Sequence, residues 1–244
     1  MEVYLNRVDG IDDAIISLYL SKRSLTPELE AHIREEVRKA TIPNGPTQGA
    51  LDRSLTSDAF RRDYLDKLFR WGRKHMTLLR FIDLSFTVYG LHRGAQDDFD
   101  SHAMRLQNRI VRSSTRLADY QEGELSDYYR DKIIPLGAAV GLLDLNLPEV
   151  ITHQGRTFVR GENGYVRQDL QDDRDVRRGL YMLSIPSNFI FRVSLTEFAH
   201  IYKERRREGT ANPELKEAVE AMADQLEFAT IGYANRDLLV SIPN

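Results

Sequence analysis

The sequence predicts one α+β domain that spans residues 1–244. Two segments rich in β-forming residues, at 2–8 and 81–89, alternate at least partly between apolar and polar residues, as strands do. Helix-start signals and apolar residues spaced three or four apart occur in several segments between and after them. The sequence has no repeat, low-complexity tract or long linker, so a single domain is the simplest organisation.

The N-terminal segment predicts a strand followed by two helices. After the strand at 2–8, the turn at 9–12 leads into the first helix. Thr26 is a hydroxyl N-cap for the second helix, and Pro27 suits its first position because that residue needs no N–H donor. We expect this helix to end near Thr41, before a Pro- and Gly-containing breaker.

A third helix and a central strand follow. Ser57 and Asp58 provide a helix cap. The apolar side of this helix is expected to consist of Phe60, Tyr64, Leu65, Leu68 and Trp71. The segment 81–89 is rich in β-forming residues and predicts a central strand.

Four arginines after Gly94 are spaced by four, three and four residues: Arg105, Arg109, Arg112 and Arg116. On a helix reaching about Ser114, these steps would place the guanidinium groups along one face. Such a row of like charges is costly unless an anion lies over it, and the neighbouring hydroxyls suit a phosphate ester. A solvated cationic face is the alternative.

The C-terminal half predicts further helices and a hairpin. A helix is expected within 125–145, interrupted near Pro135, and a hairpin over 150–166 with its turn at 162–164. Two more helices are expected over 195–207 and 213–228.

The composition of the chain excludes several kinds of functional site. The chain has no cysteine, which excludes disulfides, thiolate metal sites and a cysteine nucleophile. Its six histidines include no pair spaced as on a zinc-binding helix, so we expect no metal site. The net charge of −3 argues against a general nucleic-acid binder. No apolar run is long enough to span a membrane and no signal-peptide pattern is present, so the expected compartment is the cytoplasm.

Arg205 is expected on the apolar side of its helix, because Leu195, Phe198 and Tyr202 precede it at steps of three, four and three. An unpaired buried guanidinium costs several kcal/mol, about the penalty of any isolated buried charge. Arg205 therefore either contacts a ligand or forms an internal salt bridge, or its side chain reaches solvent from the helix end.

The order and spacing of these arginines resemble those of the flavin-dependent thymidylate synthase family. That family has an Arg-His-Arg motif, a seven-residue gap and a Ser-x-Arg, which here correspond to 104–106 and to Ser114 with Arg116. At 104–106 this chain has Met-Arg-Leu in place of Arg-His-Arg, and Arg105 is the arginine left in the motif. Arg178, Ser194 and Arg205 follow at intervals similar to those of the family's phosphate-binding arginine, flavin-contacting asparagine and pyrimidine-contacting arginine.

The resemblance covers roughly residues 60–230 and implies that family's fold, a central antiparallel or mixed sheet with flanking helices, with the hairpin at 150–166 as an insertion. It implies nucleotide binding by Ser114, Arg116, Arg178 and Arg205, with Arg205 also catalytic. The implied flavin contacts are Thr77, Arg105, Ser194 and His200, although His200 is also explained as a satisfied core histidine.

The implied reaction is methylation of carbon 5 of UMP or dUMP, with methylenetetrahydrofolate as carbon donor and NADPH-reduced FAD, and without an enzyme nucleophile. The altered motif resembles a specialised branch, the uridylate methylases of polyoxin-type nucleoside-antibiotic pathways. Family members form homotetramers with shared active sites. Two alternatives stay open: a relative that binds nucleotide as a structural or sensing protein, and a nucleic-acid-binding module.

Overall fold

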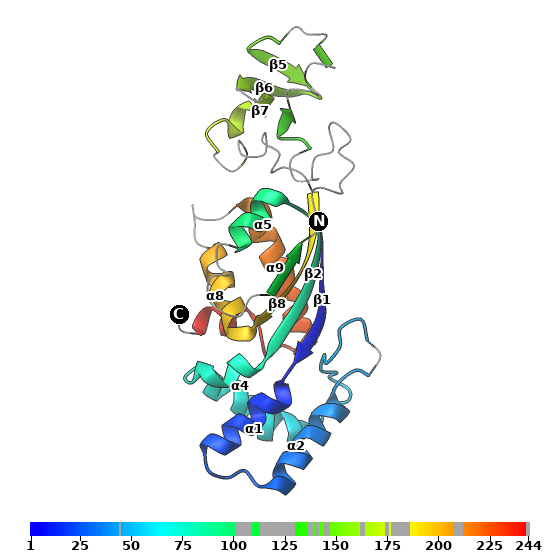
Figure 1. The fold of residues 1–244 in the computed structure, drawn as a ribbon, viewed down its shortest axis with the longest axis vertical. Coiled ribbons are helices and arrows are strands. Elements are labelled where there is room, and N and C mark those ends of the chain that lie inside the picture. Colours follow the sequence, from blue (N-terminus) through cyan, green and yellow to red (C-terminus); the bar gives the residue numbers. More distant parts are fainter. Residues whose placement is uncertain are drawn as a thin grey trace.

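A computed structural model gives the fold of the chain (Figure 1). The residues that the structure describes are 1–43, 45–100, 109–112, 130–135, 139, 142–143, 147–161, 164–173, 176, 186–206 and 212–242. Within α5 and the strands β3 and β4, some of these are described by their backbone alone.

The N-terminal part follows the predicted order. Its elements are β1 (Glu2–Asp9), α1 (Ile11–Ser21), α2 (Pro27–Ala40), α3 (Asp58–Phe60), the π-helix η1 (Arg61–Leu65), α4 (Asp66–Gly72) and the 3₁₀ helix η2 (Met76–Phe81). The hydroxyl of Thr26 accepts the N–H of Leu29 at 3.2 Å, and that of Ser57 accepts the N–H of Phe60 at 3.1 Å. Both predicted caps are confirmed, because each satisfies an N–H with no partner inside the helix.

A four-stranded antiparallel sheet forms the centre of the molecule. Its strands are β1, β2 (Asp83–His92), β8 (Pro186–Ser194) and β3 (Arg109–Arg112), in that spatial order. In the strand register, Phe86 of β2 pairs with Leu5 of β1 on one side and with Phe191 of β8 on the other. The predicted α+β class and the predicted strands at 2–8 and 81–89 are confirmed, with β2 beginning two residues later than expected.

The prediction of a helix that carries all four arginines is wrong. The helix after β2, α5 (Arg93–Asp100), is followed by strand β3, in which Arg109 and Arg112 pair with Arg192 and Phe189 of β8. Arg109 and Arg112 flank Ile110 and Val111, which are β-branched and favour a strand once β8 offers an edge. The steps of four, three and four therefore do not define one helical face.

A second antiparallel sheet contains β4 (Ile133–Pro135), β7 (Gly164–Arg167), β6 (Arg156–Gly161) and β5 (Val150–His153), in that spatial order. The expected hairpin is confirmed as β6–β7, and β5 extends it, while the expected turn residues 162 and 163 lie outside the described residues. The helix expected within 125–145 is wrong at β4, where Ile133 pairs with Val166. This sheet has small apolar clusters of its own.

The main core lies between the first sheet and the helices on one of its faces. These helices are α8 (Leu195–Arg206), α9 (Pro213–Ala229) and the short C-terminal α10 (Arg236–Ser241). Figure 1 shows α8 and α9 on the same side of β1, β2 and β8. Phe86 stacks on Phe191 with ring centroids 5.7 Å apart, and its ring centroid lies 5.4 Å from that of Phe198 in α8. Such aromatic contacts fix α8 against the sheet.

Candidate functional site

Helix α8 and the residue that precedes it include three of the predicted site residues. Ser194 ends β8 immediately before the helix, His200 is half-buried in its middle, and Arg205 lies in its last turn. The helix has 12 residues, so at a rise of 1.5 Å per residue it is about 18 Å long. Ser194 and Arg205 therefore lie at opposite ends of the helix, too far apart to contact the same chemical group of a ligand. Their separation suits two ligands that lie side by side.

Arg205 is buried, as its spacing predicted, with 7% of the residue exposed. Its Nη2 donates to the carbonyl oxygen of Asp98 in the last turn of α5. The carbonyls at the end of a helix lack partners within it and carry partial negative charge, so a guanidinium is favoured there. Burial lowers the pKa of Arg205, while the nearby Asp98 and Glu204 oppose that shift.

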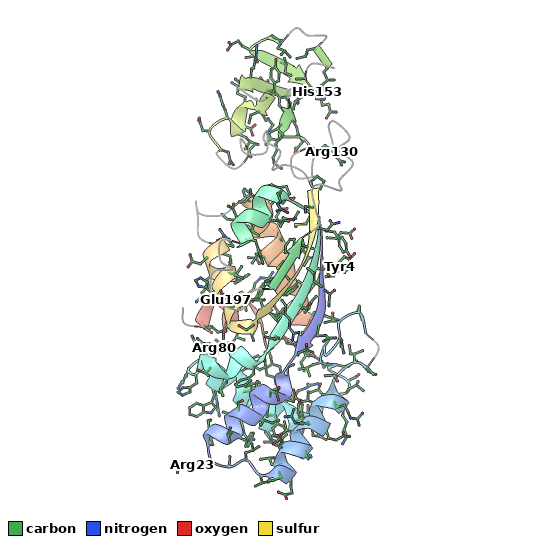
Figure 2. All side chains as sticks on the ribbon, viewed as in Figure 1. Tyr4, Arg23, Arg80, Arg130, His153 and Glu197 are labelled. Carbon is green, nitrogen blue, oxygen red and sulfur yellow. The ribbon has the colours of Figure 1, made fainter. Side chains whose placement is uncertain are left out.

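Ser194 is engaged with the start of α8. It is 3% exposed, and its hydroxyl accepts the backbone N–H of Glu197 at 3.3 Å and lies 3.1 Å from the hydroxyl of Thr196. This is the contact of an N-cap residue. Figure 2 labels Glu197 beside this end of α8.

Thr77 lies in η2, which packs against the helix α8 and strand β8. Thr77 is exposed and is surrounded in sequence by exposed cationic side chains: Arg70, Arg73, Lys74 and Arg80. None of these four forms an ion pair within the described part of the chain. Arg80 is labelled at the surface near α4 in Figure 2.

Two aromatic rings accompany these cations. Trp71 stacks on His75 with ring centroids 5.6 Å apart and planes 18° from parallel, and the Nζ of Lys22 lies 5.1 Å from the centre of the Trp71 ring. Exposed cations that form no ion pair with another described residue, beside a stacked ring pair, provide a surface that favours an anionic ligand with a flat ring system. The segment around Thr77 therefore fits a phosphate-bearing cofactor chemically.

Four other predicted site residues, Arg105, Ser114, Arg116 and Arg178, lie outside the described residues. The assignment of phosphate binding to Ser114, Arg116 and Arg178, and of a flavin contact to Arg105, thus stays a prediction.

Sequence reasoning missed a buried polar cluster next to the end of β2. Its members are His92, Gln96, Asn212 and Glu214. The sequence signals one of them, since Asn212 precedes a proline and an acid in the way of an N-cap. His92 gave no local signal, because its partner Glu214 is 122 positions away.

A hollow of about 730 Å³ lies at the outer side of β1 and β2 and beside α9. Tyr4, Tyr89 and the 81% exposed Phe228 line it, together with the acids Glu2 and Asp224. Acidic and aromatic groups suit an anionic nucleotide poorly, and this hollow contains no predicted site residue.

The described residues provide neither a metal-binding group nor a membrane-spanning helix. No group of three or more His, Asp or Glu side chains there is arranged to hold a metal ion. No helix in the same part of the chain is long and apolar enough to cross a membrane.

No protein-family model matches the sequence, and no curated protein matches it either. Solved structures do match. Thymidylate Synthase X (ThyX) from Helicobacter pylori, solved with FAD and dUMP, is 15% identical with a TM-score of 0.55, and the alignment covers 98% of this chain and 99% of that one.

A second structure of the flavin-dependent ThyX from Helicobacter pylori, complexed with FAD and dUMP, is 13% identical with a TM-score of 0.54 and covers 98% and 99% of the two chains. The UMP/dUMP methylase PolB from Streptomyces cacaoi, bound with 5-Br dUMP, matches more weakly, with 11% identity and a TM-score of 0.47 over 96% of this chain and 92% of that one. Over nearly its whole length, this chain has the fold of the flavin-dependent thymidylate synthases.

Proposed function

We propose that this protein methylates carbon 5 of a uridine monophosphate, UMP or dUMP, with methylenetetrahydrofolate as carbon donor and NADPH-reduced FAD. The observation that carries the proposal is the end-to-end likeness to a ThyX that was solved with both FAD and dUMP. The absence of cysteine supports it, because the reaction must proceed without a thiol that adds to the pyrimidine ring.

On the nucleotide side, Arg205 contacts the uracil edge and stabilises the negative charge that develops on the ring as carbon 5 becomes nucleophilic. Its burial supports this role, since a guanidinium in a site shielded from water interacts more strongly with such charge. Arg116 and Arg178 hold the phosphate by charge-assisted hydrogen bonds worth about 1.5–3 kcal/mol each. Ser114 adds a further donor.

On the cofactor side, FAD supplies the reducing equivalents and methylenetetrahydrofolate the carbon. Thr77, Arg105, Ser194 and His200 are the residues that we propose to hold the flavin. The cationic surface around Thr77 and its position beside α8 support a dinucleotide at that end of the helix, with the nucleotide substrate at the Arg205 end.

Direct binding and turnover test the proposal. We expect purified protein to be yellow or to become so on reconstitution with FAD, to bind UMP or dUMP, and to release the 5-methylated nucleotide when methylenetetrahydrofolate and NADPH are added. Arg205→Ala should lower turnover by about 100-fold or more, as loss of one group that stabilises developing charge does. Methylation of neither nucleotide by flavin-loaded protein would contradict the proposal.

The alternative is a relative that binds nucleotide but no longer performs flavin chemistry. One observation favours it: the hydroxyl of Ser194, at the position of the implied flavin contact, already caps α8. Colourless protein that binds dUMP and cannot be reconstituted with FAD would support this alternative.

A further inference from the structure

The polar cluster missed by sequence reasoning joins three elements. His92 ends β2, Gln96 lies in α5, and Asn212 and Glu214 lie at the start of α9. His92, Asn212 and Glu214 are each 2% exposed, and Gln96 is fully buried. Buried polar groups are costly unless they form hydrogen bonds. His92, Asn212 and Glu214 bond to one another, and Gln96 bonds to the backbone of Leu91, so these four residues are a built feature of the fold.

Asn212 lies against one ring nitrogen of His92. The Oδ1 of Asn212 accepts the backbone N–H of Glu214 at 2.9 Å, which turns its Nδ2 donor toward the Nε2 of His92 at 3.3 Å. The Nε2 atom thus faces a donor of Asn212, while Nδ1 faces Glu214.

Glu214 accepts a hydrogen bond from the other ring nitrogen of His92. Its Oε2 accepts from Nδ1 of His92 and also faces the backbone N–H of His92 at 3.4 Å. The carboxylate lies in the first turn of α9, where the helix dipole favours negative charge. Hydrogen bonds thus join His92 to Asn212 and to Glu214, and Glu214 to Asn212; we call these three residues the His92 network.

The helix α5 connects this network to Arg205. In the middle of α5, the side chain of Gln96 donates to the carbonyl of Leu91 in β2 at 3.0 Å. In the last turn of α5, the backbone carbonyl of Asp98 accepts a hydrogen bond from the guanidinium of Arg205. With eight residues, α5 is about 12 Å long, and it packs against both α9 and β2.

We propose that the His92 network positions Arg205: it fixes the start of α5 to α9, and α5 in turn presents the Asp98 carbonyl that holds the guanidinium. The inference rests on the proposed function, because only there does Arg205 contact the nucleotide. The three network residues do not touch the nucleotide and are positioning residues.

Two measurements on the whole 244-residue chain test this without flavin or turnover. One is hydrogen exchange at the backbone amides of α5, and the other is the Kd for dUMP from calorimetry. Glu214→Ala removes the acceptor and should speed exchange in α5 and raise the Kd by about tenfold or more, as loss of a group that orients a binding residue does. Glu214→Gln keeps an acceptor oxygen and should stay within about threefold of wild type.

Thr230→Ala is the matched control. Thr230 is also buried, at 1% exposure, and lies at the other end of α9, where its hydroxyl donates to the Leu226 carbonyl at 2.8 Å and accepts the N–H of Ala234 at 3.0 Å. Its loss should lower the melting temperature while α5 exchange and the Kd for dUMP stay at wild-type values.

The outcomes separate the two levels of the proposal. Wild-type protein that binds dUMP, together with a folded Glu214→Ala variant of unchanged Kd and unchanged α5 exchange, would overturn the positioning role and leave the proposed function standing. Wild-type protein that binds neither dUMP nor UMP would overturn both. If Glu214→Ala does not fold, His92→Leu removes the same hydrogen bond and is judged by the same two measurements.

Discussion

Ser194 illustrates how a single side chain can be committed to the fold and still lie at a ligand site. Its hydroxyl caps α8 through the N–H of Glu197, and the resemblance to flavin-dependent thymidylate synthases places a flavin contact at the same residue. Asparagine, which the family has there, is an equally good N-cap. The cap alone therefore explains a polar residue at this position, and a flavin contact needs separate evidence.

Replacement of Ser194 distinguishes the two roles. Ser194→Ala should lower the free energy of unfolding by about 1 kcal/mol through loss of the cap, whereas Ser194→Asn should keep it. Urea denaturation measures stability, and a fluorescence titration measures FAD affinity. An FAD affinity equal to wild type in the alanine variant would show that Ser194 is only a cap; wild-type stability in that variant would contradict the cap.

At the scale of elements, the junction of β1 and α1 depends on a close backbone contact. Gly10 has φ of +78°, and a Cβ built there would lie 2.0 Å from the carbonyl oxygen of Phe81 at the end of η2. The sequence predicted a turn here, and the structure explains why it contains glycine: α1 and η2 can approach only without a side chain between them. This contact fixes the end of the segment that carries Thr77.

A pair of glycine substitutions tests that approach. Gly155, in the turn between β5 and β6, has a similar φ of +74° but nothing within 4 Å of a Cβ. Gly155→Ala should cost about 1–2 kcal/mol from left-handed backbone strain alone. Gly10→Ala should cost about 1–3 kcal/mol more, because the methyl group meets a carbonyl that must move. An equal loss of stability in the two variants, measured by thermal unfolding, would show that the contact with Phe81 is unimportant.

At the scale of the whole molecule, the described site residues do not converge on one point. Ser194 and Arg205 lie at the two ends of α8, and Thr77 lies on a segment that packs against that helix. A dinucleotide and a mononucleotide together could occupy such a length, and a neighbouring subunit could complete it. The homotetramer with shared active sites, which the resemblance implies, stays a prediction.

Subunit mixing tests shared sites. We expect purified protein to behave as a tetramer by sizing with light scattering, and Arg205→Ala to be inactive. When Arg205→Ala is co-expressed with Ser114→Ala, Arg116→Ala or Arg178→Ala, at least one pair should regain activity above either variant alone, because intact sites form between subunits. A monomer, or no regain with any pair, would contradict shared sites.

The sequence by itself determined the features that depend on near neighbours. The caps at Thr26 and Ser57, strand β1 and the burial of Arg205 could all be predicted, because capping, alternation and helical spacing act over a few residues. The resemblance of the arginine-bearing segments indicated the fold, which the likeness to ThyX confirms.

Only the tertiary structure decided the features that need a distant partner. The segment Arg109–Arg112 is a strand because β8 offers it an edge, and its arginines alone suggested a helix. His92 meets Glu214 across 122 positions, a contact that no local pattern records. Local preferences are worth a fraction of a kcal/mol per residue, about 1 at most for residues other than proline, so strand pairing and buried hydrogen bonds override them wherever the fold brings distant segments together.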